Sequence, residues 1–502
     1  VLAHCKQGLC QLWVVIFSTL RQFRRVSFTG FDRGLVSALP ADLASKAAMV
    51  DVERRFLLLN SDNVFSVKNM VLEIGSVEKH SANPLFVEDK PWEQRFDNFY
   101  GNITFDLEDG LYKCWYSPFI VAHSAKDLTL QDRQELPYQG LKNQEMGVCY
   151  AQSWDGINWE KPDLGLVEYD GNKSNNLVMR SVHGAGVLKD ELCSDASRRY
   201  KSVFQGLRVS FSSDGLAWSN PEKINCELAG DTHNNAVWVQ SLNKYVAFTR
   251  DWIKTDREIK GAESKSNHSW CRRVARIESS DFVNWSSSEV VIDTDCWELQ
   301  PYSMAVFEYA DIYLGLLVIH DQRSDRAWTE LAYSVDTIKW QRIDPGQALI
   351  GCSDIELAYD YGCVYACARP VFLEDEVRLY YGGSDWLHFG WRNGCLALAT
   401  MRPDGFAGYK PVSEDEVGKL TTVPITYCVE AIKVTAYIEP DGYIDIKILD
   451  DAGAVWAEQR IFSTATDQTV VAESALELDT LQIEFTVQSA QLFSFLLVAK
   501  AQ

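Results

Sequence analysis

The stretch SWDGINW at residues 153–159 decides the fold, because the chain returns to it four more times. The copies are SSDGLAW at 212–218, SSDFVNW at 279–285, SVDTIKW at 334–340 and, with a weaker match, RPDGFAGY at 402–409. Their aspartates recur at intervals of 55 to 68 residues. An Asp-Gly pair favours a tight turn, since Asp bonds its own backbone and Gly accepts positive φ. The pattern therefore predicts five repeats of one structural unit.

Each copy follows a strand-like run, and two more alternating segments precede it, as in AVWVQSLNKYVAFTR at 236–250. About four strands per repeat is the content of a propeller blade, and helical periodicity is nearly absent from 95–410. We therefore expect an all-β chain with a five-bladed β-propeller at 49–416. The repeat stops after that, and strands alternate with Asp-Gly and Ala-Gly turns. This change predicts a small C-terminal antiparallel β-sandwich at 417–502.

Residues 1–48 are predicted to be an N-terminal extension of unknown role. Their apolar run QLWVVIFSTL at 11–20 is too short to span a bilayer. Arginines follow this run rather than precede it, which disfavours a signal peptide.

The composition argues against several kinds of partner. A formal net charge of −22 would repel the phosphates of nucleic acid and the surface of an anionic membrane. The 13 cysteines have no paired spacing, and no set of metal ligands with credible spacing emerges. We expect buried free thiols, a reducing compartment and hence the cytoplasm, with the periplasm or secretion as the alternatives. No cofactor or metal is predicted.

The innermost strands of a propeller line a central channel, and their starts meet at one mouth. Counting back from each repeat copy places the five starts at 95–103, 182–188, 230–238, 297–307 and 360–368. Polar side chains at these starts are therefore expected to face one shared pocket.

Three of the starts carry a carboxylate, namely Asp97, Asp231 and Glu298. Cleavage of a glycosidic bond needs two carboxylates that flank it, one as proton donor and one as nucleophile or as base for water. A third carboxylate commonly tunes the acid, since clustered negative charges raise one another's pKa. The alternative interpretations are a turn-capping role for Asp97 and an ordinary surface position for Glu298.

Four segments resemble the motifs of a known clan of enzymes. FDNFYG at 96–101 stands where β-fructofuranosidases have NDPNG, and HGAG at 183–186 where they have an FSGS-type segment. GDTHNNAVW at 230–238 stands in place of RDP, and WELQP at 297–301 in place of EC. In motif order the chain resembles the five-bladed propeller glycoside hydrolases that include β-fructofuranosidases, arabinanases and β-xylosidases, and is most similar to a bacterial branch related to them.

This resemblance implies a role for each carboxylate. Asp97 would be the nucleophile or general base, and Glu298 would be the general acid. Asp231 would stabilise the transition state by holding sugar hydroxyls. Other side chains at or near the starts are predicted to contact the carbohydrate substrate. They are Trp92, Asn98, His183, His233, Asn234, Arg250, Gln300, Tyr302, Asp360, Tyr361, Asp385 and His388.

Together these residues predict a glycoside hydrolase that acts on an oligo- or polysaccharide. Two alternatives stay open: a non-catalytic propeller that binds carbohydrate or a protein, and a glycoside phosphorylase. A binding module has no need of three carboxylates. A phosphorylase needs a basic phosphate pocket, for which Arg250, Arg276 and Arg369 are candidates.

Overall fold

The computed structural model describes residues 53–254, 270–294, 297–413, 415–426, 429–472 and 480–499, so the predicted extension at 1–48 lies outside them. The described residues are almost entirely β-structure, which confirms the all-β prediction. The α-helix among them is the short α4 (Leu130–Glu135). No helix of this described part is long and apolar enough to cross a membrane.

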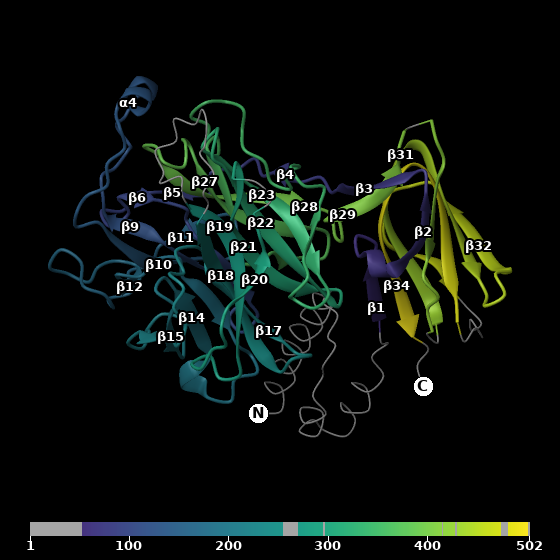
Figure 1. Ribbon diagram of the computed structural model, residues 1–502, viewed down its shortest axis with the longest axis horizontal. Coiled ribbons are helices and arrows are strands. Elements are labelled where there is room, and N and C mark those ends of the chain that lie inside the picture. The colour runs from purple at the N-terminus through teal and green to yellow at the C-terminus, as the bar shows by residue number, and fades with distance from the viewer. Residues whose placement is uncertain are drawn as a thin grey trace, which may run out of the picture.

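Antiparallel strand groups succeed one another along the chain from residue 102 to residue 401 (Figure 1). The first three groups are β7 (Asn102–Asp106), β8 (Leu111–Tyr116), β10 (Glu145–Ser153) and β12 (Leu177–Arg180); β13 (Gly186–Lys189), β14 (Tyr200–Phe204), β15 (Arg208–Ser212) and β16 (Glu222–Lys223); and β17 (Asn235–Val239), β18 (Lys244–Lys254), β19 (Trp270–Ser279) and β20 (Glu289–Ile292). The next two are β21 (Leu299–Tyr309), β22 (Ile312–Asp321), β23 (Arg326–Ser334) and β24 (Gln341–Ile343); and β25 (Cys363–Ala366), β27 (Val377–Ser384) and β28 (Gly394–Met401). The first strand of every group begins within or directly after a predicted start.

The last group is completed by strands from the beginning of the chain. β4 (Glu78–Lys79) and β5 (Phe86–Val87) pair with β28 in antiparallel fashion. Lys79 in β4 also forms an ion pair of 2.6 Å with the buried Asp360. These contacts join residues separated by most of the sequence, and they place the first strand group beside the last.

The repeated turn has the same bonds in four of its copies. Oδ1 of Asp155 accepts hydrogen bonds from the backbone N–H groups of Ile157 and Asn158, at 2.8 and 2.7 Å. The indole N–H of Trp159 donates to the carbonyl of Gly156 at 3.2 Å. The copies centred on Asp214, Asp281 and Asp336 repeat this arrangement. The predicted role of the Asp in closing the turn is confirmed for these four copies, and the Trp adds a second bond across it.

The fifth copy differs, because its Asp404 is fully buried. Asp404 accepts hydrogen bonds from the hydroxyl groups of Tyr309 and Ser494 and forms an ion pair with Arg55. Arg55 also bonds both carboxylate oxygens of Asp467, at 2.8 and 2.9 Å. The aspartate here connects the strand groups to the C-terminal sheet instead of closing a turn.

Nine further strands form one sheet around two long ones, β31 (Val429–Leu449) and β34 (Gln482–Ala499). The others are β1 (Glu53–Leu57), β2 (Val64–Lys68), β3 (Met70–Ile74), β29 (Ala407–Pro411), β30 (Gly418–Thr422), β32 (Val455–Ile461) and β33 (Ala465–Ala472). The short β9 (Pro118–Val121) and β11 (Trp159–Glu160) pair with β10, and β26 (Val371–Phe372) pairs with β27. In Figure 1 the purple β1 to β3 lie among the yellow C-terminal strands at one end of the molecule. The prediction that residues 49–416 all belong to the propeller is wrong for β1 to β3 and for β29. β1 to β3 hydrogen-bond to β34, β30 and β29, and β29 also pairs with β34.

Candidate active site

Asp97 is held by two arginines. It follows the short strand β6 (Arg95–Phe96), and its Oδ1 accepts hydrogen bonds from Arg392 at 2.6 Å and from Arg95 at 3.0 Å. Burial by itself would raise the pKa of Asp97, but the charges of Arg392 and Arg95 outweigh it and hold the pKa below its ordinary value. Asp97 is therefore ionised at neutral pH. Both arginine bonds go to Oδ1, and no hydrogen bond to Oδ2 is made within the described chain.

Asn98 ties this carboxylate to the fourth strand group. Its Nδ2 donates to the hydroxyl groups of Tyr100 and Tyr302, at 2.6 and 2.7 Å. Its Oδ1 accepts a hydrogen bond of 2.9 Å from Arg392, the arginine that also bonds Asp97. The structure thus brings Asp97, Asn98 and Tyr302 together, from starts that lie about two hundred residues apart in the sequence.

Asp231 comes from the start of the third strand group and lies beside His183. Its side chain is 45% exposed, and Nε2 of His183 lies 3.7 Å from its Oδ1. Gln205 donates a hydrogen bond of 3.2 Å to the same oxygen, and Arg250 lies 3.8 Å from Oδ2. Burial lowers the pKa of His183, while the charges of Asp97 and Asp231 both act to raise it.

Two arginines lie over the ring of Tyr302. The guanidinium carbon of Arg250 is 4.3 Å from the ring centroid and that of Arg272 is 5.0 Å from it. Arg250 donates to the carbonyl of Tyr302 at 2.8 Å, and Arg272 donates to Oε1 of Gln300 at 3.0 Å. We call the group formed by these residues the Asp97 cluster. Its members are Asp97, Asn98, Tyr100, His183, Asp231, Arg250, Arg272, Gln300, Tyr302 and Arg392.

A pair of buried histidines borders the Asp97 cluster. The rings of His320 and His388 are 4.4 Å apart, and that of His388 lies 5.0 Å from the ring of Tyr302. Burial lowers the pKa of His320 to about 4 and that of His388 well below its ordinary value, so both are neutral at pH 7. Nδ1 of His388 is hydrogen-bonded to Tyr365 at 2.7 Å, and Nε2 of His320 lies 3.0 Å from Asp325.

Glu298 lies directly before β21, at the edge of the Asp97 cluster. Its side chain is 21% exposed and accepts a hydrogen bond of 2.7 Å from Arg323. It stands two residues before Gln300, so in an extended chain the two side chains share a face. Within the described chain, the polar contacts of the Glu298 side chain are with Arg323 and not with Asp97 or Asp231.

His233 and Asn234 act as links between strand groups. Nδ2 of Asn234 donates to the carbonyls of Gly184 and Gly230, both at 2.9 Å. Nε2 of His233 lies 3.2 Å from Oδ1 of Asn102, and burial lowers its pKa to about 3. These bonds hold together the starts of the groups that carry Asp97, His183 and Asp231.

The structure gives the other four predicted sugar contacts partners outside the Asp97 cluster. Trp92 donates to Asn176 at 2.7 Å. Asp360 accepts from Tyr381 at 2.9 Å as well as pairing with a lysine. Tyr361 stacks on Trp386, with the ring centroids 5.7 Å apart. Asp385 is bonded by both Nη atoms of Arg133, at 2.8 and 3.2 Å, and by Asn393.

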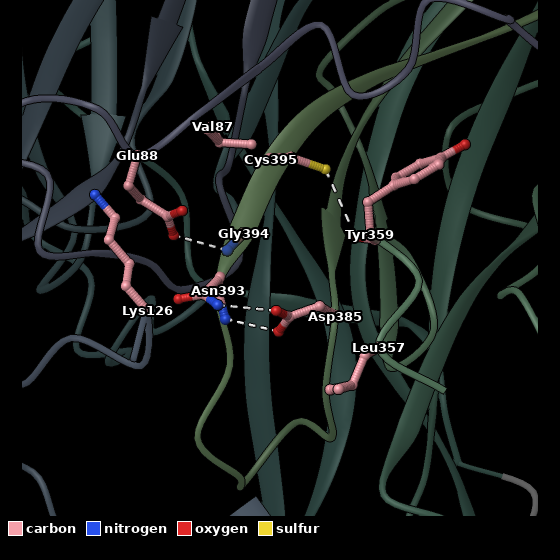
Figure 2. Close-up of a pocket in the computed structure, with 9 residues that line it drawn as sticks. All are labelled: Val87, Glu88, Lys126, Leu357, Tyr359, Asp385, Asn393, Gly394 and Cys395. Carbon is pink, nitrogen blue, oxygen red and sulfur yellow. Dashed lines mark hydrogen bonds between the residues drawn. The ribbon is translucent and has the colours of Figure 1, made fainter. Parts of the chain in front are cut away.

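A cavity of about 290 Å³ lies beside the loop that carries Arg392 (Figure 2). Glu88 faces it and accepts hydrogen bonds from the backbone N–H groups of Phe96 at 2.8 Å and Gly394 at 2.7 Å. Burial raises the pKa of Glu88 to about 7, despite these bonds. Phe96 precedes Asp97, and Gly394 follows Arg392 by two residues, so Glu88 holds both segments of the Asp97–Arg392 pair.

Sequence reasoning missed Arg392, Arg272, Tyr100 and Arg95. Arg272 could have been predicted from the segment CRRVAR at 271–276, which carries three arginines in a strand-like run. Arg392 lies on a loop and carries no comparable signal. Among the described residues no group of three or more His, Cys, Asp or Glu side chains is placed to hold a metal ion.

No protein-family model matches the chain. No curated protein matches it either. Among solved structures, the chain is similar to an N-acetylgalactosamine deacetylase from F. plautii, with 12% identity, a TM-score of 0.40, and coverage of 66% of this chain and 95% of that one. It is similar to a β-1,2-mannobiose phosphorylase from Listeria innocua, with 14%, 0.40, 65% and 96% for the same quantities. It is also similar to a glycoside hydrolase family 43 arabinoxylan arabinofuranohydrolase from Bacillus subtilis, with 10%, 0.38, 84% and 99%.

Proposed function

We propose that this chain is a carbohydrate-active enzyme that cleaves glycosidic bonds, and that the Asp97 cluster is its active site. The strand groups are the five blades of a propeller, closed by β4 and β5, and the C-terminal sheet is a β-sandwich that includes β1 to β3. The same turn geometry repeated four times along the chain, together with the order of the strands, supports this architecture.

The observation that carries the proposal is that Asp97 and Asp231, from separate blades, approach the same tyrosine, Tyr302. Asn98 beside Asp97 bonds the Tyr302 hydroxyl, and Arg250, which lies over the Tyr302 ring, is 3.8 Å from Asp231. A glycosidic bond is cleaved between two carboxyl groups that approach it from different sides. Two carboxylates that come from separate blades and lie in one cluster therefore support this chemistry.

Asp97 fits the nucleophile or the general base. Two arginines fix its Oδ1 and keep it ionised, while Oδ2 is left to meet the anomeric carbon or a water. A carboxylate anchored by one oxygen is held in a single orientation, which lowers the cost of reaching the transition state.

Asp231 and Glu298 complete the proposed machinery. Asp231 is the most exposed of the three carboxylates, with 45% of its side chain accessible, and it is placed to accept hydrogen bonds from sugar hydroxyls. Glu298 is the general acid, at the rim where the leaving group departs. Substrate binding would bring it over the cluster by replacing its bond to the exposed Arg323.

The competing proposal is a propeller that binds carbohydrate without reacting. Incubating the purified full chain with a panel of aryl glycosides of neutral and acidic sugars distinguishes the enzyme proposal from the binding proposal. The enzyme proposal expects release of the aryl group from at least one glycoside, in proportion to protein concentration. Binding of the same sugars in calorimetry, with no release of any aryl group, would favour the binding module.

A further inference from the structure

Arg250 and Arg272 are neighbouring cations on adjacent strands. Arg272 in β19 is paired in register with Trp252 of β18, and Arg250 stands two residues before that Trp. The two arginines are therefore diagonal neighbours on one face of the sheet. Both are buried, with 3% and 7% of their surface exposed.

Neither arginine donates a hydrogen bond to a carboxylate within the described residues, and only Arg250 has an ion-pair partner, Asp231. Arg250 lies 3.8 Å from Oδ2 of Asp231, beyond hydrogen-bond length. Among the described residues Arg272 forms no ion pair, and its side-chain bonds go to the neutral Gln300 and His320. Arg95 and Arg392, in contrast, both bond Asp97 directly. The half of the cluster around Tyr302 therefore carries an excess of positive charge.

Their hydrogen-bonding capacity is also unfilled. The Nε atoms of Arg250 and Arg272 are buried and have no hydrogen-bond partner within the described residues; Arg95 and Arg276 share this feature but also bond carboxylates. The pKa of Arg272 is lowered to about 10 by burial and by the charge of Arg250, which is the opposite of what a matched carboxylate would do. Buried charges are normally paired, and a guanidinium binds planar or tetrahedral oxyanions through several N–H groups at once.

We infer that Arg250 and Arg272 form a subsite for an oxyanion, either a carboxylate or a phosphate group, beside Asp231. The inference rests on the proposed function and adds the chemical class of its ligand. In a uronic acid the oxyanion belongs to the sugar, and the two arginines select an acidic residue of the polysaccharide. Free phosphate would instead enter as the group that attacks the sugar in place of water.

The phosphate case is chemically balanced with the groups present. A phosphate oxygen forms the bond to the anomeric carbon while the glycosidic C–O bond breaks. The leaving oxygen takes a proton from Glu298, and the proton of hydrogen phosphate restores that acid. The products are a sugar phosphate and the shortened saccharide. The three arginines suggested from the sequence are not gathered for this purpose, because Arg276 is bonded to Glu278 and Glu289.

Calorimetric titration of the full chain tests the subsite directly. Sodium phosphate and sodium glucuronate are the probes, and glucose at the same ionic strength is the neutral control. We expect at least one of the two anions to bind, and Arg272→Gln to weaken that binding at least tenfold. Arg276→Gln, on the same strand but paired with two glutamates, is the matched control and should bind like the wild type.

Binding of neither anion to the wild type overturns the inference, and so does equal binding by Arg272→Gln. Thermal unfolding of each variant shows whether it is folded. Arg272→Lys is a second variant that keeps the positive charge but loses the planar guanidinium, and it is also expected to bind the anion more weakly. Product analysis assigns the source: a sugar phosphate identifies phosphate, and cleavage restricted to uronate-containing saccharides identifies the carboxylate. Anion binding is measured without catalysis, so it stands even if no glycoside is cleaved.

Discussion

Arg392 donates a hydrogen bond of 2.6 Å to Oδ1 of Asp97, across 295 positions of sequence. Asp97 precedes the first strand group, and Arg392 lies between β27 and β28 of the last. The bond therefore crosses the point where the two ends of the strand series meet. The candidate nucleophile depends on this closure for its charge state and its orientation.

Replacing Arg392 with Gln should impair the enzyme in a pH-dependent way. The pKa of Asp97 is lowered by Arg392 and Arg95, so loss of one arginine raises it towards its ordinary value. Asp97 is then protonated at a higher pH than in the wild type, and the acid limb of the kcat/KM profile moves to higher pH. We expect the activity at neutral pH to fall about tenfold or more. Arg460→Gln, an exposed arginine of the C-terminal sheet paired with Asp445, is the control and should leave the profile unchanged.

Glu88→Gln should remove a pH-dependent loss of stability. The folded pKa of Glu88 is about 7, above the ordinary value of 4.5, so between these values the folded state binds more protons than the unfolded state. Stability therefore falls as pH rises from about 4.5 to about 7 and is constant above, by about 3 kcal/mol in total. Gln keeps an oxygen that accepts the two backbone bonds and cannot ionise. Urea unfolding of both proteins at pH 5 and pH 8 measures the difference, and an equal pH dependence in the two would contradict the assignment.

Arg55→Met should destabilise the joint between the strand groups and the C-terminal sheet. It leaves the buried Asp404 without its cation, and breaking one side of a buried ion pair costs about 3–5 kcal/mol. Urea unfolding measures this loss. Arg460→Met removes an exposed pair and is expected to cost much less, because water screens the two charges. Similar losses in the two variants would show that the Arg55–Asp404 pair contributes no more than a surface contact.

Glu298→Gln should discriminate between substrates. A general acid matters for poor leaving groups, which need a proton as they depart, and matters little for good ones such as nitrophenolate. We expect the variant to retain most of its activity on activated aryl glycosides and to lose it on unactivated saccharides. A proportional loss on both classes would argue that Glu298 is not the proton donor.

The sequence predicts the parts of this structure that depend on contacts between residues close together in the chain. Asp155 and Trp159 close their turn with bonds to residues at most three positions away, and the same letters recur in three other copies. Asp404 has matching neighbours in sequence but meets Arg55 and Ser494 instead, which no local pattern encodes. β4 has two residues, too few for periodicity to show, so the closure of the strand series was not predictable.

The candidate site divides in the same way. Asp97, Asp231 and Tyr302 stand at strand starts that repeat counting can find. Arg392 and Arg272 contact residues that are distant in the sequence, so their role depends on which strand groups become neighbours. Asp385 carries the letters expected of a sugar contact but is bonded by Arg133, because a helix-bearing loop from another part of the chain reaches it.

The most direct test of the account is kcat/KM of Asp97→Asn on the best aryl glycoside, measured beside Asp385→Asn. Asp385 is a partly buried, arginine-bonded carboxylate outside the Asp97 cluster, so its variant controls for the loss of a structural charge. We predict that Asp97→Asn loses at least about 10³-fold while remaining folded, and that Asp385→Asn keeps most of its activity. Turnover by folded Asp97→Asn at the wild-type rate would contradict the central claim that carboxylates of separate blades cleave the sugar.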